Sequence, residues 1–492
     1  MTAVSTTTPE DTAERFRAAL GPGRLLEFAV TGLDRVGTPV WSTWWQGSLV
    51  GDGGSGGIGY GSTEPSARVG ALGELVENVS SARVVGAEPR ESGSLREAVR
   101  RHGADAVVDP RLLGLPAGSA FDDDRPLQWL ATTRLRDGAE VWVPAELVAS
   151  EPTDLPGEPP PGGWLTTPVT NGLGAGTSRE QAVRHGLLEV LQRDGNGLTF
   201  RAMDAGRVID LTGVTDPATL AALDRLRAAG IDVVAKLAAT DFGLVNVDVV
   251  GSAPEDDLLA ASGCGEAVHA DREEALRKAV LEFAASRARK QLMHGPVERV
   301  LAIAPPAYAE VVAAVDPAKD EPRVLEAMLG WLRLPAEQWR PAYDATVLRE
   351  VERVPFTALP TAPAHLPLAE VTERLAAEGL DVLVRDLTTP RAAEAGVAAA
   401  KVVVPGLEVE TVAYARIGER NLTRLLGGGR DDLVRVGTRP PGWARVHLTA
   451  EAEERVGGPA WLDRDALDRV PGLFFPLYRE PARHAAPLAL AG

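Results

Sequence analysis

The residues best suited to chemistry lie at positions 170–194, where polar and charged side chains recur at steps of three and four. They are Gln181, His185, Glu189, Gln192 and Arg193. At this spacing they share or border one face of a helix. Glycine-rich backbone precedes that helix, and a loop that lets a ligand approach closely before a helix N-terminus suits an anion. Charges at such spacing are also typical of a solvated helix face, so the pattern alone leaves both interpretations open.

Two other segments repeat this arrangement. A predicted helix at 67–80 follows the glycine-rich turn at 59–62 and carries Glu74 and Glu77 one turn apart. A third predicted helix, at 273–292, follows the turn at 263–265 and carries Glu282 and Arg287. The same arrangement thus occurs three times: a turn, then a helix of small residues with acidic or arginine side chains that can point inward. This repetition indicates a shared function rather than three solvent-exposed helix faces.

The composition excludes several classes of protein. Sixty-nine acidic against 51 basic residues give a formal charge of −18 without a basic block, which argues against a nucleic-acid partner. No apolar run reaches membrane-spanning length, and the polar N-terminus lacks a secretory signal, so we expect a soluble, cytoplasmic protein. The single cysteine, Cys264, excludes a disulfide framework and favours a small buried residue in a turn, with a thiol nucleophile as the alternative.

The pattern along the chain predicts a mixed α/β (α+β) architecture. We expect a helix at 9–20, strands at 25–45, a hairpin turning at Asp137-Gly138, and paired strands at 231–251 and 379–404. Residues 51–61 predict a flexible segment, either a surface loop or a ligand lid. They do not form a P-loop because no Gly-Lys-Ser/Thr follows. Residues 411–492 hold no recognisable motif, although LFFPLY near the end should be packed.

The segments, taken in order, resemble the YcaO family, whose members bind ATP without a Walker motif. The resemblance is carried by GALGELVEN (70–78) and GTSREQAVRHGLLEVLQR (176–193). Further similar segments are TGLDRVGTPV (31–40), LQWLATTRLRDGAEVWVPA (127–145), EALRKAVLEFAASRAR (274–289), GLDVLVRDLTTP (379–390) and KVVVPGLE (401–408). Each segment alone is weak evidence, whereas the ordered set is specific.

The resemblance implies an enzyme that uses ATP to phosphorylate a backbone amide oxygen of a ribosomally made precursor peptide. Attack by a thiol, hydroxyl, amine or sulfide then gives an azoline, amidine or thioamide. It also implies a YcaO-like fold in which ATP is clamped between the motif helices and a β-sheet. Phosphoryl transfer needs Mg²⁺ ions held by carboxylates and phosphate oxygens, and cations that offset the developing charge.

The resemblance also assigns roles to residues of this sequence. Glu74, Glu77 and Glu189 match positions that bind magnesium and nucleotide, and Arg193 and Arg287 match positions that meet phosphates during catalysis. The complete nucleotide-binding set is Glu74, Glu77, Thr177, Gln181, Glu189, Gln192, Arg193, Glu282 and Arg287.

Several positions depart from the family's motifs. Where the family usually has glutamate, this chain has Gln181 and Gln192, and where the family has asparagine it has Thr177. In the same way Gly70 replaces serine, Asn78 replaces arginine, Tyr60 replaces lysine and Ala285 replaces glutamine. Exchanging two carboxylates for amides weakens a divalent-metal site. Glu180 could replace Gln181 only with a shift of register, because successive helix residues point about 100° apart. Either the metal site is rebuilt, or the domain no longer uses ATP.

We therefore expect a YcaO-like domain at 25–410, with nucleotide motifs near 59–80, 170–194 and 263–289, between an N-terminal segment (1–24) and a C-terminal tail region (411–492). The tail lacks the proline-rich end of azoline-forming relatives, which argues against a typical cyclodehydratase. No fused leader-binding domain is visible. The expected partners are a precursor peptide, a separate leader-binding, TfuA-like or ubiquitin-activating-like protein, and a second copy in a homodimer.

Two alternatives to an active amide-modifying enzyme stay open. A catalytically reduced YcaO-like subunit would bind peptide or scaffold an active partner, which the lost carboxylates favour. An unrelated ATP-utilising ligase or carboxylate-activating enzyme would act on a small molecule. Magnesium-dependent nucleotide binding separates the first alternative from an active enzyme, and a neighbouring precursor-peptide gene separates the second.

Overall fold

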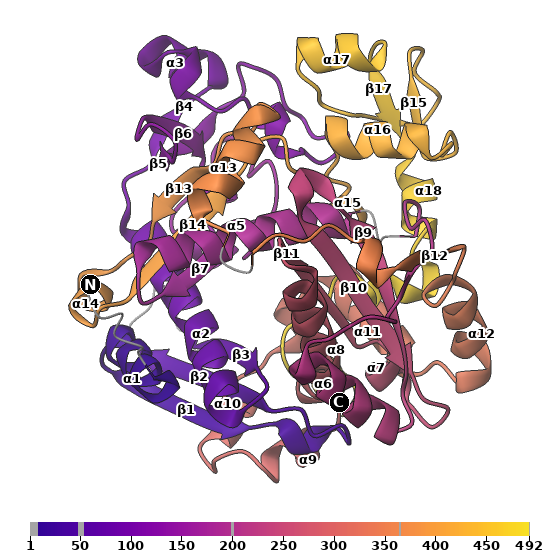
Figure 1. The fold of residues 1–492 in the computed structure, drawn as a ribbon. Coiled ribbons are helices and arrows are strands. Elements are labelled where there is room, and N and C mark those ends of the chain that lie inside the picture. Colours follow the sequence, from indigo (N-terminus) through magenta and orange to yellow (C-terminus); the bar gives the residue numbers. More distant parts are fainter. Residues whose placement is uncertain (1–7, 48–53, 198–200, 364–365, 492) are drawn as a thin grey trace.

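The computed structural model describes residues 8–47, 54–197, 201–363 and 366–491, arranged as four sheets with helices around them (Figure 1). The first sheet joins β1 (Gly23–Ala29), β2 (Val40–Gly47) and β3 (Ser55–Tyr60) in that order. The second has the order β4-β5-β13-β14-β7, with β6 beside β5. Its strands are β4 (Glu91–Gly93), β5 (Leu127–Arg134), β6 (Glu140–Pro144), β7 (Leu173–Gly176), β13 (Leu383–Asp386) and β14 (Ala398–Val403).

The third sheet has the order β11-β10-β9-β8-β12. Its strands are β8 (Arg207–Asp210), β9 (Asp232–Ala239), β10 (Val245–Ser252), β11 (Cys264–His269) and β12 (Glu352–Pro355), and only the β8–β12 pair is parallel. A small fourth sheet, in the order β15-β17-β16, consists of β15 (Val434–Val436), β16 (Ala444–Arg445) and β17 (Ala460–Leu462). The predicted mixed helix-and-sheet architecture is therefore confirmed.

Three long helices follow three edge strands. They are α2 (Glu64–Ala87) after β3, α5 (Arg179–Asn196) after β7, and α8 (Arg272–His294) after β11. Each helix begins after a side chain that accepts a hydrogen bond from the first turn: Thr63, Ser178 and Asp271. Figure 1 shows these three strand–helix units around the centre of the molecule.

The remaining helices surround these units. They are α1 (Pro9–Leu20), α3 (Leu95–His102), α4 (Ala145–Val148), α6 (Pro217–Ala228), α7 (Leu258–Ala261), α9 (Val297–Leu301), α10 (Tyr308–Ala313), α11 (Pro322–Leu332), α12 (Ala336–Thr346), α13 (Leu368–Ala377), α14 (Pro390–Glu394), α15 (Thr411–Tyr414), α16 (Glu419–Gly427), α17 (Ala450–Val456), α18 (Arg464–Arg469) and α19 (Ala485–Ala491).

Glycine lets each long helix pack directly on the backbone of its edge strand. A Cβ added to Gly59 of β3 would lie 2.0 Å from the Ala71 nitrogen, and one on Gly174 of β7 would lie 2.0 Å from the Ala182 oxygen. A Cβ on Gly265 of β11 would lie 2.0 Å from the Ala279 oxygen. The three units therefore share one packing geometry, in which strand and helix backbones touch.

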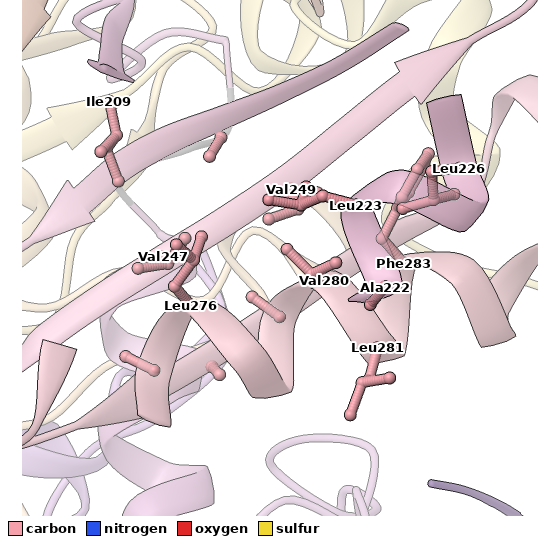
Figure 2. Close-up of a cluster of buried hydrophobic side chains, with 14 of the residues drawn as sticks. Ile209, Ala222, Leu223, Leu226, Val247, Val249, Leu276, Val280, Leu281 and Phe283 are labelled. Atoms are coloured by element: carbon pink, nitrogen blue, oxygen red, sulfur yellow. The ribbon is translucent and has the colours of Figure 1, made fainter. Parts of the chain in front are cut away.

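A large core fixes the third unit. β10 is buried along nearly its whole length, as its apolar run predicts. Figure 2 shows Val247 and Val249 of β10 pointing toward Leu276 and Val280 of α8, with α6 completing the cluster. This packing holds α8 firmly against the third sheet.

The C-terminal region folds back onto the rest of the chain. Its small sheet shares a core with Ala117 and Val324, and Phe474 and Phe475 are buried, as the apolar LFFPLY segment predicts. The His484 amide then donates to the Met293 oxygen of α8 at 2.8 Å. Residues near the C-terminus therefore reach the helix that carries the third motif.

The structure confirms the hairpin at Asp137-Gly138 and corrects two expectations. Residues 55–60, predicted as part of a flexible segment, form the edge strand β3, because glycines there accept the backbone of α2. Residues 48–53 of that segment lie outside the described residues. Cys264 lies on β11 rather than in a turn, and burial raises the pKa of its thiol strongly, which argues against a thiolate nucleophile.

We expect Gly265→Ala to destabilise the fold by about 1–3 kcal/mol, because its Cβ would strike helix backbone that cannot move independently. Gly330→Ala is the matched control. Gly330 lies within α11 with no atom near its added Cβ, so alanine there should be neutral or stabilise by up to about 1 kcal/mol. Urea unfolding measures both, and equal stability of the two variants would contradict this packing.

Candidate nucleotide-binding site

The three long helices place a glutamate at the same position. Glu74, Glu189 and Glu282 are each the eleventh residue of their helix. Each accepts a hydrogen bond from backbone of, or just before, its own edge strand. The Ile58 amide donates to Glu74 at 2.8 Å, the Gly172 amide to Glu189 at 3.0 Å, and the Glu266 amide to Glu282 at 3.1 Å. The outward N–H groups of an edge strand need such partners, so each carboxylate is fixed beside a sheet edge.

The residue one turn later connects neighbouring units. These fourteenth positions are Glu77, Gln192 and Ala285. Glu77 of α2 accepts a hydrogen bond from the Ala175 amide of β7 at 2.8 Å. The Gln192 side chain of α5 lies close enough to Glu266 of β11 to lower the pKa of that carboxyl group. The first unit thus contacts the second, and the second contacts the third.

Arg193 lies where these units meet. Its guanidinium is 3.3 Å from Glu266 and 3.5 Å from Glu189. Burial lowers the pKa of Arg193, but the carboxylates of Glu189, Glu266 and Glu282 outweigh burial and raise it. Its Nε is buried and has no hydrogen-bond partner among the residues that the structure describes. A buried donor of this kind needs an acceptor, and a phosphate oxygen would supply one.

The motif carboxylates repel one another. Burial, and after it the charges of Glu189 and Glu74, raise the pKa of Glu77 well above its usual range. Burial also raises the pKa of Glu74, and burial together with Glu266 raises that of Glu282 to about 7. Solvent nevertheless reaches the Glu74 side chain. A site that crowds accessible carboxylates in this way favours the arrival of cations.

Among the described residues, no group of three or more acidic, histidine or cysteine side chains is arranged to bind a metal ion. Magnesium rarely uses such a group, since it binds through one or two carboxylates together with phosphate oxygens and water. Pairs such as Glu74 with Glu77 fit that mode. The donor set and the free Nε of Arg193 therefore suit a magnesium–nucleotide complex.

Arg287 does not join this group. Its side chain is fully buried, with both terminal nitrogens 2.9 Å from Asp256 and further contact with Asp34 at 3.2 Å. This placement makes Arg287 a structural ion pair and does not support the phosphate contact predicted for it. Arg289, two residues later, instead exerts its charge on Glu74 and Glu282.

Thr177 and Gln181 lie at the start of α5. The Thr177 amide and hydroxyl both donate to the Gln181 side-chain oxygen, at 2.9 and 3.1 Å. One turn on, His185 lies 3.9 Å from Glu77. Gln181 thus closes the turn before the helix, while His185 extends the polar face toward the carboxylates.

Sequence reasoning missed cations and acids that come from other elements. Arg289 and Lys290 pair with Glu480, and the charge of Arg483 acts on Glu74. Arg483 is held by the Ser42 hydroxyl at 3.1 Å and the Tyr308 hydroxyl at 3.2 Å. No periodicity connects residues 480 and 483 with α8, so only the folded chain reveals them.

A family model described as YcaO cyclodehydratase, ATP- and Mg²⁺-binding, matches residues 58–408. The chain belongs to the YcaO family. Its cofactors are accordingly ATP and Mg²⁺, and the family is one of enzymes. The match covers all three motif helices and confirms the resemblance found in the sequence.

Two relatives are similar to this chain over much of its length. An uncharacterized protein of Methanothermobacter thermautotrophicus is 30% identical over 423 residues, covering 84% of this chain and 97% of that protein. An uncharacterized protein from the tfuA 3′ region of Rhizobium leguminosarum bv. trifolii is 26% identical over 315 residues, which are 62% of this chain and 66% of that protein.

Two solved structures share the YcaO fold. YcaO from Methanopyrus kandleri, bound with AMPPCP and Mg²⁺, has a TM-score of 0.57 and 21% identity, covering 84% of this chain and 94% of its own. A heterocyclase in complex with substrate and cofactor has a TM-score of 0.61 and 18% identity. The match covers 87% of this chain and 55% of the heterocyclase, so this chain spans little more than half of it. Within the described ranges, no helix has the length and apolarity to cross a bilayer.

The raised pKa of Glu282 predicts how pH affects stability without nucleotide. The folded state holds the Glu282 proton more tightly than the unfolded chain does, so its contribution is fully present below about pH 4.5. That contribution is lost as pH rises through about 7. We therefore expect Glu282→Gln to be more stable than wild type above pH 7 and similar at pH 5.

Urea unfolding of both proteins at pH 5, 6, 7 and 8 measures this difference. Glu180→Gln, an exposed change on α5, is the control and should follow wild type throughout. A constant difference between Glu282→Gln and wild type at all pH values would contradict the raised pKa.

Proposed function

We propose that this protein uses ATP to activate a backbone amide of a ribosomally made precursor peptide, giving an azoline, thioamide or amidine. The helix glutamates converge beside Arg193, whose Nε has no partner in the described part of the chain, and this convergence is the main support for the proposal. The family match supports the use of ATP and Mg²⁺. The fold is shared with a heterocyclase in complex with substrate and cofactor, which supports a heterocycle-forming reaction.

In this proposal the amide oxygen attacks the γ-phosphorus and ADP leaves. A nucleophile then attacks the amide carbon, and phosphate departs with the former amide oxygen. Magnesium would neutralise charge on the phosphates when bound.

The chain's own residues hold the reacting groups in this reaction. Glu74, Glu77 and Glu189 would hold Mg²⁺, and their hydrogen bonds to edge-strand amides keep them in place before it arrives. Arg193 would donate from its free Nε to phosphate. The charges of Arg289 and Arg483 would offset those of the carboxylates and phosphates.

Residues 25–410 would form the catalytic domain, with ATP between the motif helices and the sheet edges. We propose that leader recognition comes from a separate protein, and the relative from the tfuA 3′ region favours a TfuA-like partner. A homodimer is the assembly that the family suggests.

A second candidate is a catalytically reduced subunit that binds peptide or supports an active partner. Gln192 and Ala285 favour it, because they stand where α2 has a second glutamate, Glu77. This alternative predicts that the purified chain binds nucleotide weakly and converts no peptide alone.

Reconstitution tests the proposal. The purified protein, with any partner encoded beside it, is incubated with ATP, Mg²⁺ and the precursor peptide encoded nearby, whose amide oxygens carry a heavy-oxygen label. We expect a mass change of one lost water per azoline, or oxygen exchanged for sulfur in a thioamide, and label in the released phosphate.

The variant Glu74→Ala/Glu189→Ala should lose both conversion and magnesium-dependent nucleotide binding, because it removes two of the fixed carboxylates. Glu180→Ala, exposed on the same helix as Glu189, should retain both. Peptide conversion that survives in the double variant would refute the assigned site.

A further inference from the structure

The internal repeat indicates where a carboxylate is missing. The fourteenth helix position carries Glu77 in the first unit and the neutral Gln192 in the second. Gln192 reaches the next edge strand, as Glu77 does, and there its side chain meets Glu266. A glutamate at position 192 would therefore place a second carboxylate beside Glu266. The pair therefore holds a single carboxylate, on the strand instead of the helix.

Glu266 lies among groups that compensate its charge only in part. Arg193 is 3.3 Å away but is shared with Glu189, and Asn196 donates to Glu266 as a neutral amide. Burial and the charge of nearby Glu410 raise the pKa of Glu266. The positive charge of Arg193 is thus shared among several carboxylates.

Asp248 of β10 lies beside Glu266. It stands directly opposite Glu266 in the β10–β11 register, so their side chains share a face of the sheet. Asp248 is 8% exposed, and its carboxylate has no hydrogen bond or ion pair with any described residue. Lys236 stands opposite Asp248 on β9, but its ammonium group forms an ion pair with Asp204 at 2.7 Å. A buried carboxylate without a partner calls for a cation.

We propose that Glu266 and Asp248 form a divalent-cation subsite beside Arg193, which replaces the carboxylate absent at Gln192. This inference rests on the proposed use of magnesium and nucleotide. Two carboxylates suffice, because Mg²⁺ keeps water and phosphate oxygens as its other ligands. Arg193, released from Glu266 by the cation, is then free to contact phosphate.

An exchange of the two side chains tests the proposal. Glu266→Gln should weaken binding of Mn²⁺, followed by electron paramagnetic resonance with and without a non-hydrolysable ATP analogue, by about tenfold or more. The reciprocal variant Glu266→Gln/Gln192→Glu returns one carboxylate to the pair and should recover most of that loss. Asp248→Asn, which breaks no hydrogen bond, should also weaken Mn²⁺ binding.

Glu180→Gln is the matched control and should bind like wild type. Unchanged Mn²⁺ affinity in Glu266→Gln and Asp248→Asn, in a wild type that binds Mn²⁺ and nucleotide, would overturn the subsite and leave the proposed function standing. If the reciprocal variant did not recover Mn²⁺ binding, the claim that Glu266 replaces the carboxylate absent at Gln192 would also be wrong. A wild type that binds neither Mn²⁺ nor nucleotide would overturn the proposed function and this inference together.

Discussion

The structure depends on the hydrogen bond between a helix glutamate and the backbone of, or just before, an edge strand. Glu74, Glu189 and Glu282 each make this bond three turns into a helix whose backbone touches the same strand through glycine. The bond satisfies amides that the sheet leaves unpaired, and it positions a carboxylate without using another side chain. The same contact thus completes three sheets and builds a site where their edges meet.

This arrangement accumulates negative charge, which links the fold to its ligand. Glu77, Glu74 and Glu282 all have raised pKa values, chiefly through burial. Arg193 alone cannot compensate the charges of these carboxylates, and no described residue accepts a hydrogen bond from its Nε. A cation–phosphate complex would satisfy both the carboxylates and the arginine. The free protein therefore carries electrostatic strain that a ligand of this kind relieves.

Much of the fold and site was predictable from local pattern. Periodicity identified the three motif helices and the glutamates at 74, 189 and 282, because side-chain direction on a helix follows from spacing alone. Strand β3 was missed because its glycines show no strand propensity and serve packing against α2 instead.

The roles of Arg287 and Arg289 depended on contacts distant in sequence. Both arginines lie on α8. Arg287 forms ion pairs with Asp34 and Asp256, whereas the charge of Arg289 acts on Glu74. Arg483 and Glu480 come from a tail whose course no periodicity describes. Glu266 belongs to a strand where only the register reveals Asp248 beside it.

The claim that three strand–helix units form one nucleotide site is tested most directly by hydrogen–deuterium exchange with a non-hydrolysable ATP analogue and Mg²⁺. We expect exchange to slow together in peptides covering β3–α2, β7–α5 and β11–α8, and only when magnesium is present. Slower exchange in one unit alone, or equal effects with and without magnesium, would contradict a single site shared by the three edge strands.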